Sequence, residues 1–259
     1  MKFNIVTLFP EIIDSYFSYG VCAQAIKKDL LEINTIQLRD FAFDKHQTVD
    51  DAVYGGGDGM LLMYEPLAKA MASVGKESFT VNMSPRGKQW SDALALEWSK
   101  IPSEITVICG RYAGVDQRFI NEFVDEEISI GDYVISGGEL SAAVLVDSIA
   151  RKIKGVLGNE ISPEKDSFSD KLLEGPSFTR PQEINAALVP SVFTRGNHAN
   201  IKMVEEALSV LVTYKNREEL ITDKEKVLES VRIIKRFLSK KEIEVCGLPY
   251  IWFMELETV

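Results

Sequence analysis

The 259-residue sequence has few of the residue types that build metal and disulfide sites. It contains three cysteines, Cys22, Cys109 and Cys246, and only two histidines, His46 and His198. The cysteines are far apart and odd in number, so they form neither a zinc-ligand pattern nor a disulfide framework. We therefore expect reduced, mostly buried thiols in a cytoplasmic protein. The histidines stand in polar stretches, and no serine–histidine–acid arrangement is readable from the sequence.

Long hydrophobic runs and an excess of basic residues are also missing. No apolar run approaches the roughly 18 residues that a membrane-spanning helix needs, so no membrane partner is expected. The net charge of −10 argues against nucleic acid bound over the whole surface. A local basic cluster near the C-terminus is either a solvated helix face or a place for local RNA binding. Its members are Arg232, Lys235, Arg236, Lys240 and Lys241.

Residues 1–160 alternate short β-rich runs with helical stretches. Strands are expected at residues 3–9, 33–39, 78–83, 105–109 and 127–130. Helices are expected at residues 11–16, 21–29, 66–72, 91–99, 115–123 and 140–152. This alternation predicts an α/β domain around a mainly parallel sheet. In such sheets ligands bind beyond the carboxyl ends of the strands.

Beyond the first domain the pattern changes. A polar segment without a period indicates a linker at residues 161–175. Apolar spacing predicts helices at residues 199–214 and 223–240. We therefore predict a first domain at residues 1–160 and a small, mainly helical domain at residues 176–259.

Glycine is concentrated at three places that follow or flank apolar runs. The clusters lie at residues 55–59, 110–114 and 131–138. None fits a Walker loop or a dinucleotide fingerprint, and a single cluster of this kind is usually only a turn. Because glycine lets the backbone approach a ligand closely, three clusters together indicate a cofactor held by backbone groups. The residues alone predict an α/β small-molecule site with a helical appendage.

Several segments resemble the bacterial tRNA (guanine-37, N1)-methyltransferases of the SPOUT superfamily, the TrmD type. The most specific is Ser-Ile-Gly-Asp-Tyr-Val-Ile-Ser-Gly-Gly-Glu-Leu at residues 129–140, joined by Cys-Gly-Arg-Tyr at residues 109–112. Shorter matches are Leu-Phe-Pro at 8–10, Thr-Val-Asp-Asp at 48–51, Tyr-Gly-Gly-Gly at 54–57, Ser-Pro at 84–85, Asp-Ser-Phe at 166–168 and Gly-Asn-His at 196–198. All occur in the family's order.

The resemblance implies a trefoil-knotted parallel-sheet domain followed by the small helical domain. It also implies S-adenosylmethionine as the cofactor, and a homodimer in which the linker of one subunit completes the site of the other. The residues that match the family's cofactor pocket are Met83, Ser84, Pro85, Gly110, Tyr112, Gly114, Ile130, Gly131, Asp132, Tyr133, Val134, Ile135, Gly137, Gly138 and Leu140.

The activity that the resemblance implies is methyl transfer to N1 of guanine 37 in tRNA, next to the anticodon. Asp166 matches the general base that takes the N1 proton. Arg151 matches the cation that stabilises charge developing on guanine O6. From the residues alone, Asp166 reads as a surface residue and Arg151 as a cation at a helix end. The candidates for RNA contact are His46, Asp50, Asn197 and His198, with the basic cluster contacting phosphates.

The sequence departs from the family's pattern at several positions. Ala113 stands where the family usually has Glu, which leaves a requirement for Mg²⁺ open. Asp58 replaces a usual Pro, and the usual Trp-Arg pair after His198 is missing. Two alternatives therefore remain, a related SPOUT enzyme with another RNA substrate and a non-catalytic RNA- or cofactor-binding protein.

Overall fold

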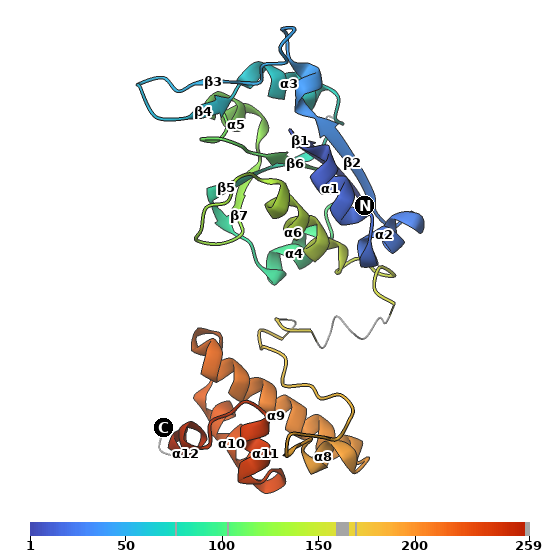
Figure 1. The fold of residues 1–259 in the computed structure, drawn as a ribbon, viewed down its shortest axis with the longest axis vertical. Helices are drawn as coiled ribbons and strands as arrows, with labels where there is room; N and C mark the ends of the chain where they lie inside the picture. Colours follow the sequence, from blue (N-terminus) through green and yellow to red (C-terminus); the bar gives the residue numbers. More distant parts are fainter. Residues whose placement is uncertain (76, 103, 159–165, 169, 257–259) are drawn as a thin grey trace. The chain divides into compact units, whose positions relative to one another are not determined.

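The chain forms two compact units, Met1–Glu160 and Ile161–Val259 (Figure 1). The computed structural model describes residues 1–75, 77–102, 104–158, 166–168 and 170–256. Of the expected linker at 161–175, residues 161–165 and 169 lie outside the described residues. Each unit has a hydrophobic core of its own. Among the described residues, no helix is long and apolar enough to cross a membrane.

The first unit is built around a five-stranded parallel sheet. In spatial order its strands are β2 (Glu32–Gln37), β1 (Lys2–Thr7), β6 (Ile105–Cys109), β5 (Phe79–Gln89) and β7 (Glu126–Ser129). The predicted α/β class with a parallel sheet is confirmed. A short turn of helix, η1 (Leu38–Phe41), and a hairpin, β3 (Asp50–Ala52) with β4 (Met60–Leu62), were not expected from the sequence.

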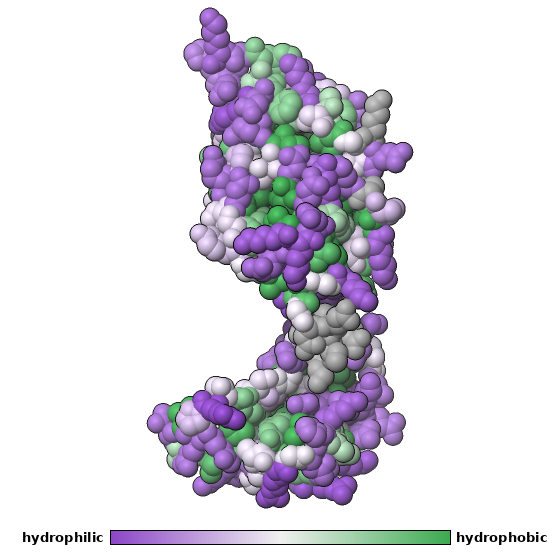
Figure 2. Space-filling view, turned by 90° about the vertical axis from the view of Figure 1, so that its right-hand side faces the viewer, coloured by the Kyte–Doolittle hydropathy of each residue, from purple (hydrophilic) through white to green (hydrophobic). Residues whose placement is uncertain are grey.

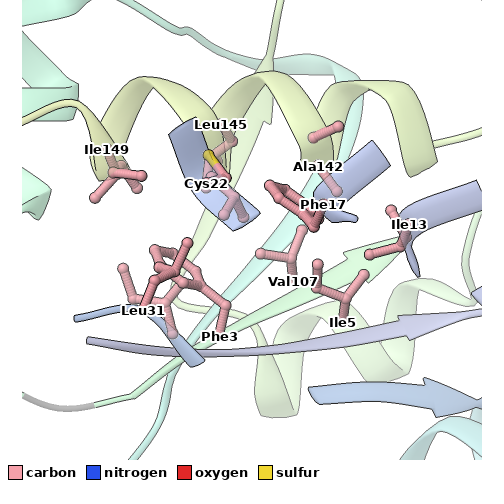
Figure 3. Close-up of a cluster of buried hydrophobic side chains, with 14 of the residues drawn as sticks. Phe3, Ile5, Ile13, Phe17, Cys22, Leu31, Val107, Ala142, Leu145 and Ile149 are labelled. Carbon is pink, nitrogen blue, oxygen red and sulfur yellow. The ribbon is translucent and has the colours of Figure 1, made fainter. Parts of the chain in front are cut away.

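Helices cover both faces of this sheet, as the continuous apolar runs in its strands require. Successive residues of a strand point to opposite faces, so Ile5 and Val107 belong to one hydrophobic cluster and Val6 and Ile108 to another. The first cluster, drawn in part in Figure 3, contains side chains of α1 (Pro10–Phe17), α2 (Gly20–Lys27), α4 (Asp92–Trp98) and α6 (Glu139–Ala150). The second contains side chains of α3 (Tyr64–Ala72) and α5 (Gln117–Phe123).

Strand β5 is longer and less regular than the sequence predicts. It continues past Met83 to Gln89, and its register against β7 shifts between Met83 and Lys88. The residues between these two positions leave the ladder and then rejoin it, as in a β-bulge. Gly87 allows the return, because a Cβ there would lie 2.3 Å from the backbone of Glu127. Ser84, Pro85 and Arg86 lie in this irregular stretch, between the two segments of β5 that pair with β7.

The second unit is mainly helical. Its elements are β8 (Glu183–Ile184), β9 (Ala187–Leu188), α8 (Ser191–Thr194), α9 (His198–Asn216), η2 (Glu218–Leu220), α10 (Lys224–Phe237), α11 (Lys240–Val245) and α12 (Tyr250–Glu255). The two predicted helices are confirmed as α9 and α10, although α10 ends at Phe237 and Ser239 caps a separate α11. Apolar side chains of α9, α10, α11 and α12 share one core. The face drawn in Figure 2 has hydrophilic residues over much of both units, with apolar ones visible among them in each.

Candidate active site

A cavity of about 490 Å³ lies at the carboxyl ends of β5, β6 and β7. Small-molecule pockets typically measure about 300 to 1,000 Å³, so the cavity is large enough for a nucleoside-sized ligand. It brings together most residues matched to the family's cofactor pocket: Met83, Ser84, Pro85, Gly110, Tyr112, Gly114, Ile130, Gly131, Tyr133, Val134, Ile135, Gly137 and Gly138. Asp132 and Leu140 are exposed and lie outside its lining.

Two of the turns that line this cavity, the one at Gly110 and the one at Gly138, approach each other very closely. The Gly138 amide donates a hydrogen bond to the Gly110 carbonyl, with an N···O distance of 2.9 Å. A Cβ added to Gly138 would lie 2.7 Å from the Cα of Cys109, and one added to Gly137 would lie 2.1 Å from Nε of Arg111. These glycines are therefore required by the contact between the turns, and they leave backbone groups facing the cavity.

A buried carboxylate holds the same two turns together. Glu139 is 1% exposed, and its Oε2 lies 2.8 Å from Nη2 of Arg111 in an ion pair. Its Oε1 accepts hydrogen bonds from Thr7 Oγ1 at 2.8 Å and from Arg111 Nε at 3.1 Å. Arg111 also donates to the Ser136 carbonyl and stacks on the ring of Phe9. A buried charge needs such partners, so this cluster fixes the floor of the cavity.

A second polar group lies on the wall formed by β5 and β7. Asn82 is 3% exposed, lines the cavity, and donates from Nδ2 to Glu127 Oε1 at 2.9 Å. Arg86 Nη2 lies 3.7 Å from the same carboxylate oxygen and donates to Gln117 Oε1 at 3.2 Å. Sequence reasoning missed Asn82, Arg86, Arg111 and Gln117 among the cavity residues. The usable signal was their place in or near the matched segments: Asn82 and Arg86 flank Ser-Pro, Arg111 belongs to Cys-Gly-Arg-Tyr, and Gln117 follows that segment by five residues.

Cys109, at the end of β6, is a buried neutral thiol rather than a nucleophile. Burial raises its pKa well above the ordinary value, the nearby Glu139 carboxylate raises it further, and Arg111 offsets only part of this effect. Cys22 also has its pKa raised, to about 12, by burial and by the hydrogen bond that it donates to Asp147. All three cysteines are unpaired and buried, as the sequence predicts.

Ala113 lines the cavity and connects it to the β3–β4 hairpin. Its amide donates to the Met60 carbonyl at 2.8 Å. Among the described residues, no Asp or Glu lines the cavity, and no group of three or more Asp, Glu, His or Cys side chains is placed to hold a metal ion. Protein-held Mg²⁺ relies on carboxylate oxygens, so the described lining of this cavity does not fit one.

The two catalytic candidates lie in different units. Arg151 is exposed at the C-terminal end of α6, whereas the cavity lies at the N-terminal end of that helix. The helix has 12 residues, which at 1.5 Å per residue separates its ends by about 18 Å. Asp166 is half-buried in the second unit, where it lines a groove of about 680 Å³ with Asp170, Glu174 and Lys202.

The candidates for RNA contact are also divided between the units. His46 is exposed and Asp50 is half-buried at the start of β3, in the first unit. Asn197 caps α9 by accepting from the Asn200 amide at 3.2 Å, and the exposed His198 follows it. All five members of the basic cluster are exposed, on the second half of α10 and the start of α11.

Comparison with known proteins gives one consistent result. The family model described as tRNA (Guanine-1)-methyltransferase TrmD matches residues 1–223. A tRNA (guanine-N(1)-)-methyltransferase of Sulfurihydrogenibium sp. is 45% identical over 247 residues, which cover 94% of this chain and 96% of the relative. Proteins of the same name from Treponema denticola and Shewanella halifaxensis are each 46% identical and cover 85% of this chain and 90% of the relative.

Proposed function

Because the chain belongs to the tRNA (guanine-1)-methyltransferase TrmD family, we propose that it transfers the methyl group of S-adenosylmethionine to N1 of guanine 37 in tRNA. The observation that carries this proposal is the cavity beyond β5, β6 and β7, which gathers the residues matched to the family's cofactor pocket. A tRNA substrate also implies that the protein works in the cytoplasm.

The cavity lining suits S-adenosylmethionine, which when bound supplies an electrophilic methyl group. Apolar side chains such as Met83, Val134 and Ile135 would enclose its uncharged parts. Backbone groups of the turns at residues 110–114 and 130–138 would provide hydrogen bonds. The close pairing of these two turns, Gly110 with Gly138 and Arg111 with Gly137, supports the further proposal that the chain is knotted here.

Asp166 is proposed as the general base. Guanine N1 carries a proton and becomes a nucleophile only as that proton leaves. A carboxylate within hydrogen-bond reach would take the proton as the methyl group passes to N1 from the sulfonium, which would leave as the neutral thioether S-adenosylhomocysteine. Negative charge then grows on guanine O6, where the guanidinium of Arg151 would stabilise it. The base, the cation and the cavity must therefore meet in the working enzyme.

A homodimer accounts for the distance between Arg151 and the cavity of its own subunit. Leu140, Val144, Asp147 and Arg151 follow one another along a single face of α6, at a spacing of three or four residues. Leu140 is 60% and Val144 47% exposed, beside the half-exposed apolar residues of α1, Ile12 and Tyr16. If this face pairs antiparallel with itself about a two-fold axis, Arg151 of the partner subunit comes toward the cavity.

The second unit is proposed to hold the anticodon arm of the tRNA. The exposed basic cluster on α10 and α11 offers five cations for phosphate contacts in an otherwise acidic protein. His46, Asp50, Asn197 and His198 remain the proposed contacts to the substrate RNA. Contact with phosphates positions the RNA, whereas contact with bases selects the nucleotide.

Methyl transfer to an unmodified tRNA transcript tests the proposed function. We expect transfer from labelled S-adenosylmethionine to a transcript with guanine at position 37, and none to the same transcript with adenine there. Transfer that ignores position 37 would favour a related enzyme with another RNA substrate. A protein that binds S-adenosylhomocysteine and methylates no tRNA would be a binding protein instead.

A further inference from the structure

One buried polar atom beside the cavity has no hydrogen-bond partner among the described residues of the protein. Oδ1 of Asn82 is buried and has no hydrogen-bond partner among the described residues. It lies beside Gly110, where an added Cβ would come within 4.0 Å of it. Buried acceptors in folded proteins are nearly always satisfied, so an unpartnered one at the edge of a cavity indicates a missing donor.

The side-chain amide of Asn82 is held in one orientation. Its Nδ2 donates to Glu127, and an ionised carboxylate only accepts hydrogen bonds. Turning the amide would place Oδ1 against that carboxylate, with two acceptors facing each other. Arg86 pairs with Glu127 and keeps it in place. The acceptor therefore points away from β7 because Glu127 fixes the opposite end of the amide.

Other buried polar side chains on the same face of the sheet have partners within the chain. Thr106 Oγ1 lies 2.6 Å from Ser78 Oγ, and Asn4 Oδ1 accepts from Asn34 Nδ2 at 3.0 Å. These residues lie toward the amino ends of the strands and are absent from the lining of the cavity. Asn82, at the cavity end of this face, is the member left with an unpartnered acceptor.

We propose that Oδ1 of Asn82 accepts a hydrogen bond from the bound cofactor, and that Glu127 acts as the positioning residue for this contact. The inference rests on the proposed function, because it takes the cavity to bind S-adenosylmethionine. That molecule offers donors of three kinds, the adenine amino group, the ribose hydroxyls and the α-ammonium group. Any of them satisfies the acceptor, and ligand analogues distinguish them.

Replacement of Asn82 by Leu, which removes the acceptor at similar volume, tests the contact. We expect the variant to bind S-adenosylhomocysteine about tenfold more weakly by calorimetry, which corresponds to about 1.4 kcal/mol. The unfolding temperature without ligand should change little, because loss of the unpartnered acceptor offsets loss of the hydrogen bond from Nδ2 to Glu127. Unchanged affinity, with or without a lower unfolding temperature, would overturn the inference and leave Asn82 a structural residue.

Thr106→Val is the matched control, since it removes a buried hydrogen-bonding group from the same face outside the cavity. It should lower the unfolding temperature and leave the affinity within about twofold, as expected for an independent site. Glu127→Gln tests the positioning role, because a glutamine lets the Asn82 amide turn. Affinity should fall, by less than in Asn82→Leu. A Glu127→Gln variant with wild-type affinity would remove Glu127 from the proposal.

Two analogues identify the donor. S-inosylhomocysteine lacks the adenine amino group, and methylthioadenosine lacks the α-ammonium group. The analogue without the contacted donor should bind wild-type protein no more tightly than Asn82→Leu, whereas equal losses for both analogues would point to a ribose hydroxyl. If wild-type protein does not bind S-adenosylhomocysteine at all, the proposed function itself is wrong. If wild-type protein and Asn82→Leu bind it equally, only this inference is wrong.

Discussion

Asp166 and Asp170, which is four positions later in the chain, show how much the role of a carboxylate depends on its surroundings. Both are acidic residues lining the same groove of the second unit. Asp166 is half-buried, whereas Asp170 is exposed. Composition and charge do not separate the two residues. Only the resemblance of the Asp-Ser-Phe segment singles out Asp166 as the base.

The first prediction compares these two residues. Asp166→Asn should lower turnover by about 10²- to 10⁴-fold, the usual contribution of a general base, because asparagine has no carboxylate to take the N1 proton. Cofactor affinity, measured by calorimetry with S-adenosylhomocysteine, should stay within a few-fold. Asp170→Asn, the matched control, should keep full turnover. Near-normal turnover in Asp166→Asn would remove this residue as the base.

At the scale of secondary-structure elements, the glycine turns set the shape of the cavity. Gly138 has φ of −75° and ψ of −8°, which any residue adopts, so its backbone conformation does not require glycine. The close approach of Gly138 to Cys109 is what requires glycine at this position. A substitution there therefore probes the contact between the turns and nothing else in the local backbone.

Gly138→Ala should cost about 1–3 kcal/mol of unfolding free energy, because the added methyl group forces Cys109 and the turn apart. It should also weaken the binding of S-adenosylhomocysteine. Gly158→Ala is the control, since a Cβ at Gly158 would meet nothing within 4 Å. Chemical denaturation of both variants checks the difference. Equal unfolding free energies of the two variants would mean that the turns can move apart without destabilising the protein.

The sequence anticipates regular elements better than the irregular ones that build the site. The strand at 105–109 and the helices α9 and α10 follow from apolar periodicity, which depends on local residues. The bulge in β5 does not follow from local residues, because the register of β5 against β7 depends on a strand far along the chain. The sequence does not predict the buried ion pair of Glu139 with Arg111 or the hydrogen bond of Asn82 to Glu127 for the same reason, since the partners are distant in sequence.

At the scale of the whole molecule, the exposed apolar face of α6 predicts a dimer. Val144→Glu places a charge in the middle of this face, and we expect the variant to become monomeric and to lose activity. Leu96→Glu, on α4, is the control, because Leu96 is a similarly exposed apolar residue on another helix. Light scattering of both variants measures the change. A dimeric Val144→Glu variant would place the interface elsewhere.

Mixing of subunits then tests whether the dimer shares its sites. An Arg151→Ala subunit retains its cavity, and a Gly138→Ala subunit retains its arginine. If the arginine of one subunit serves the cavity of the other, a mixed dimer has one intact site and is more active than either variant alone. No regain of activity would show that each subunit works with its own arginine.

The hydrogen bond between Thr7 and Glu139 also has a consequence for the order of folding. The two residues are 132 positions apart, and one stands at the end of the first strand while the other begins α6, the last helix among the described residues of the first unit. Contacts this distant in sequence form late, because a long loop must close first. A chain emerging from the ribosome cannot close the cavity floor until α6 has been synthesised. Cofactor binding by a growing chain would thus mark the completion of the first unit.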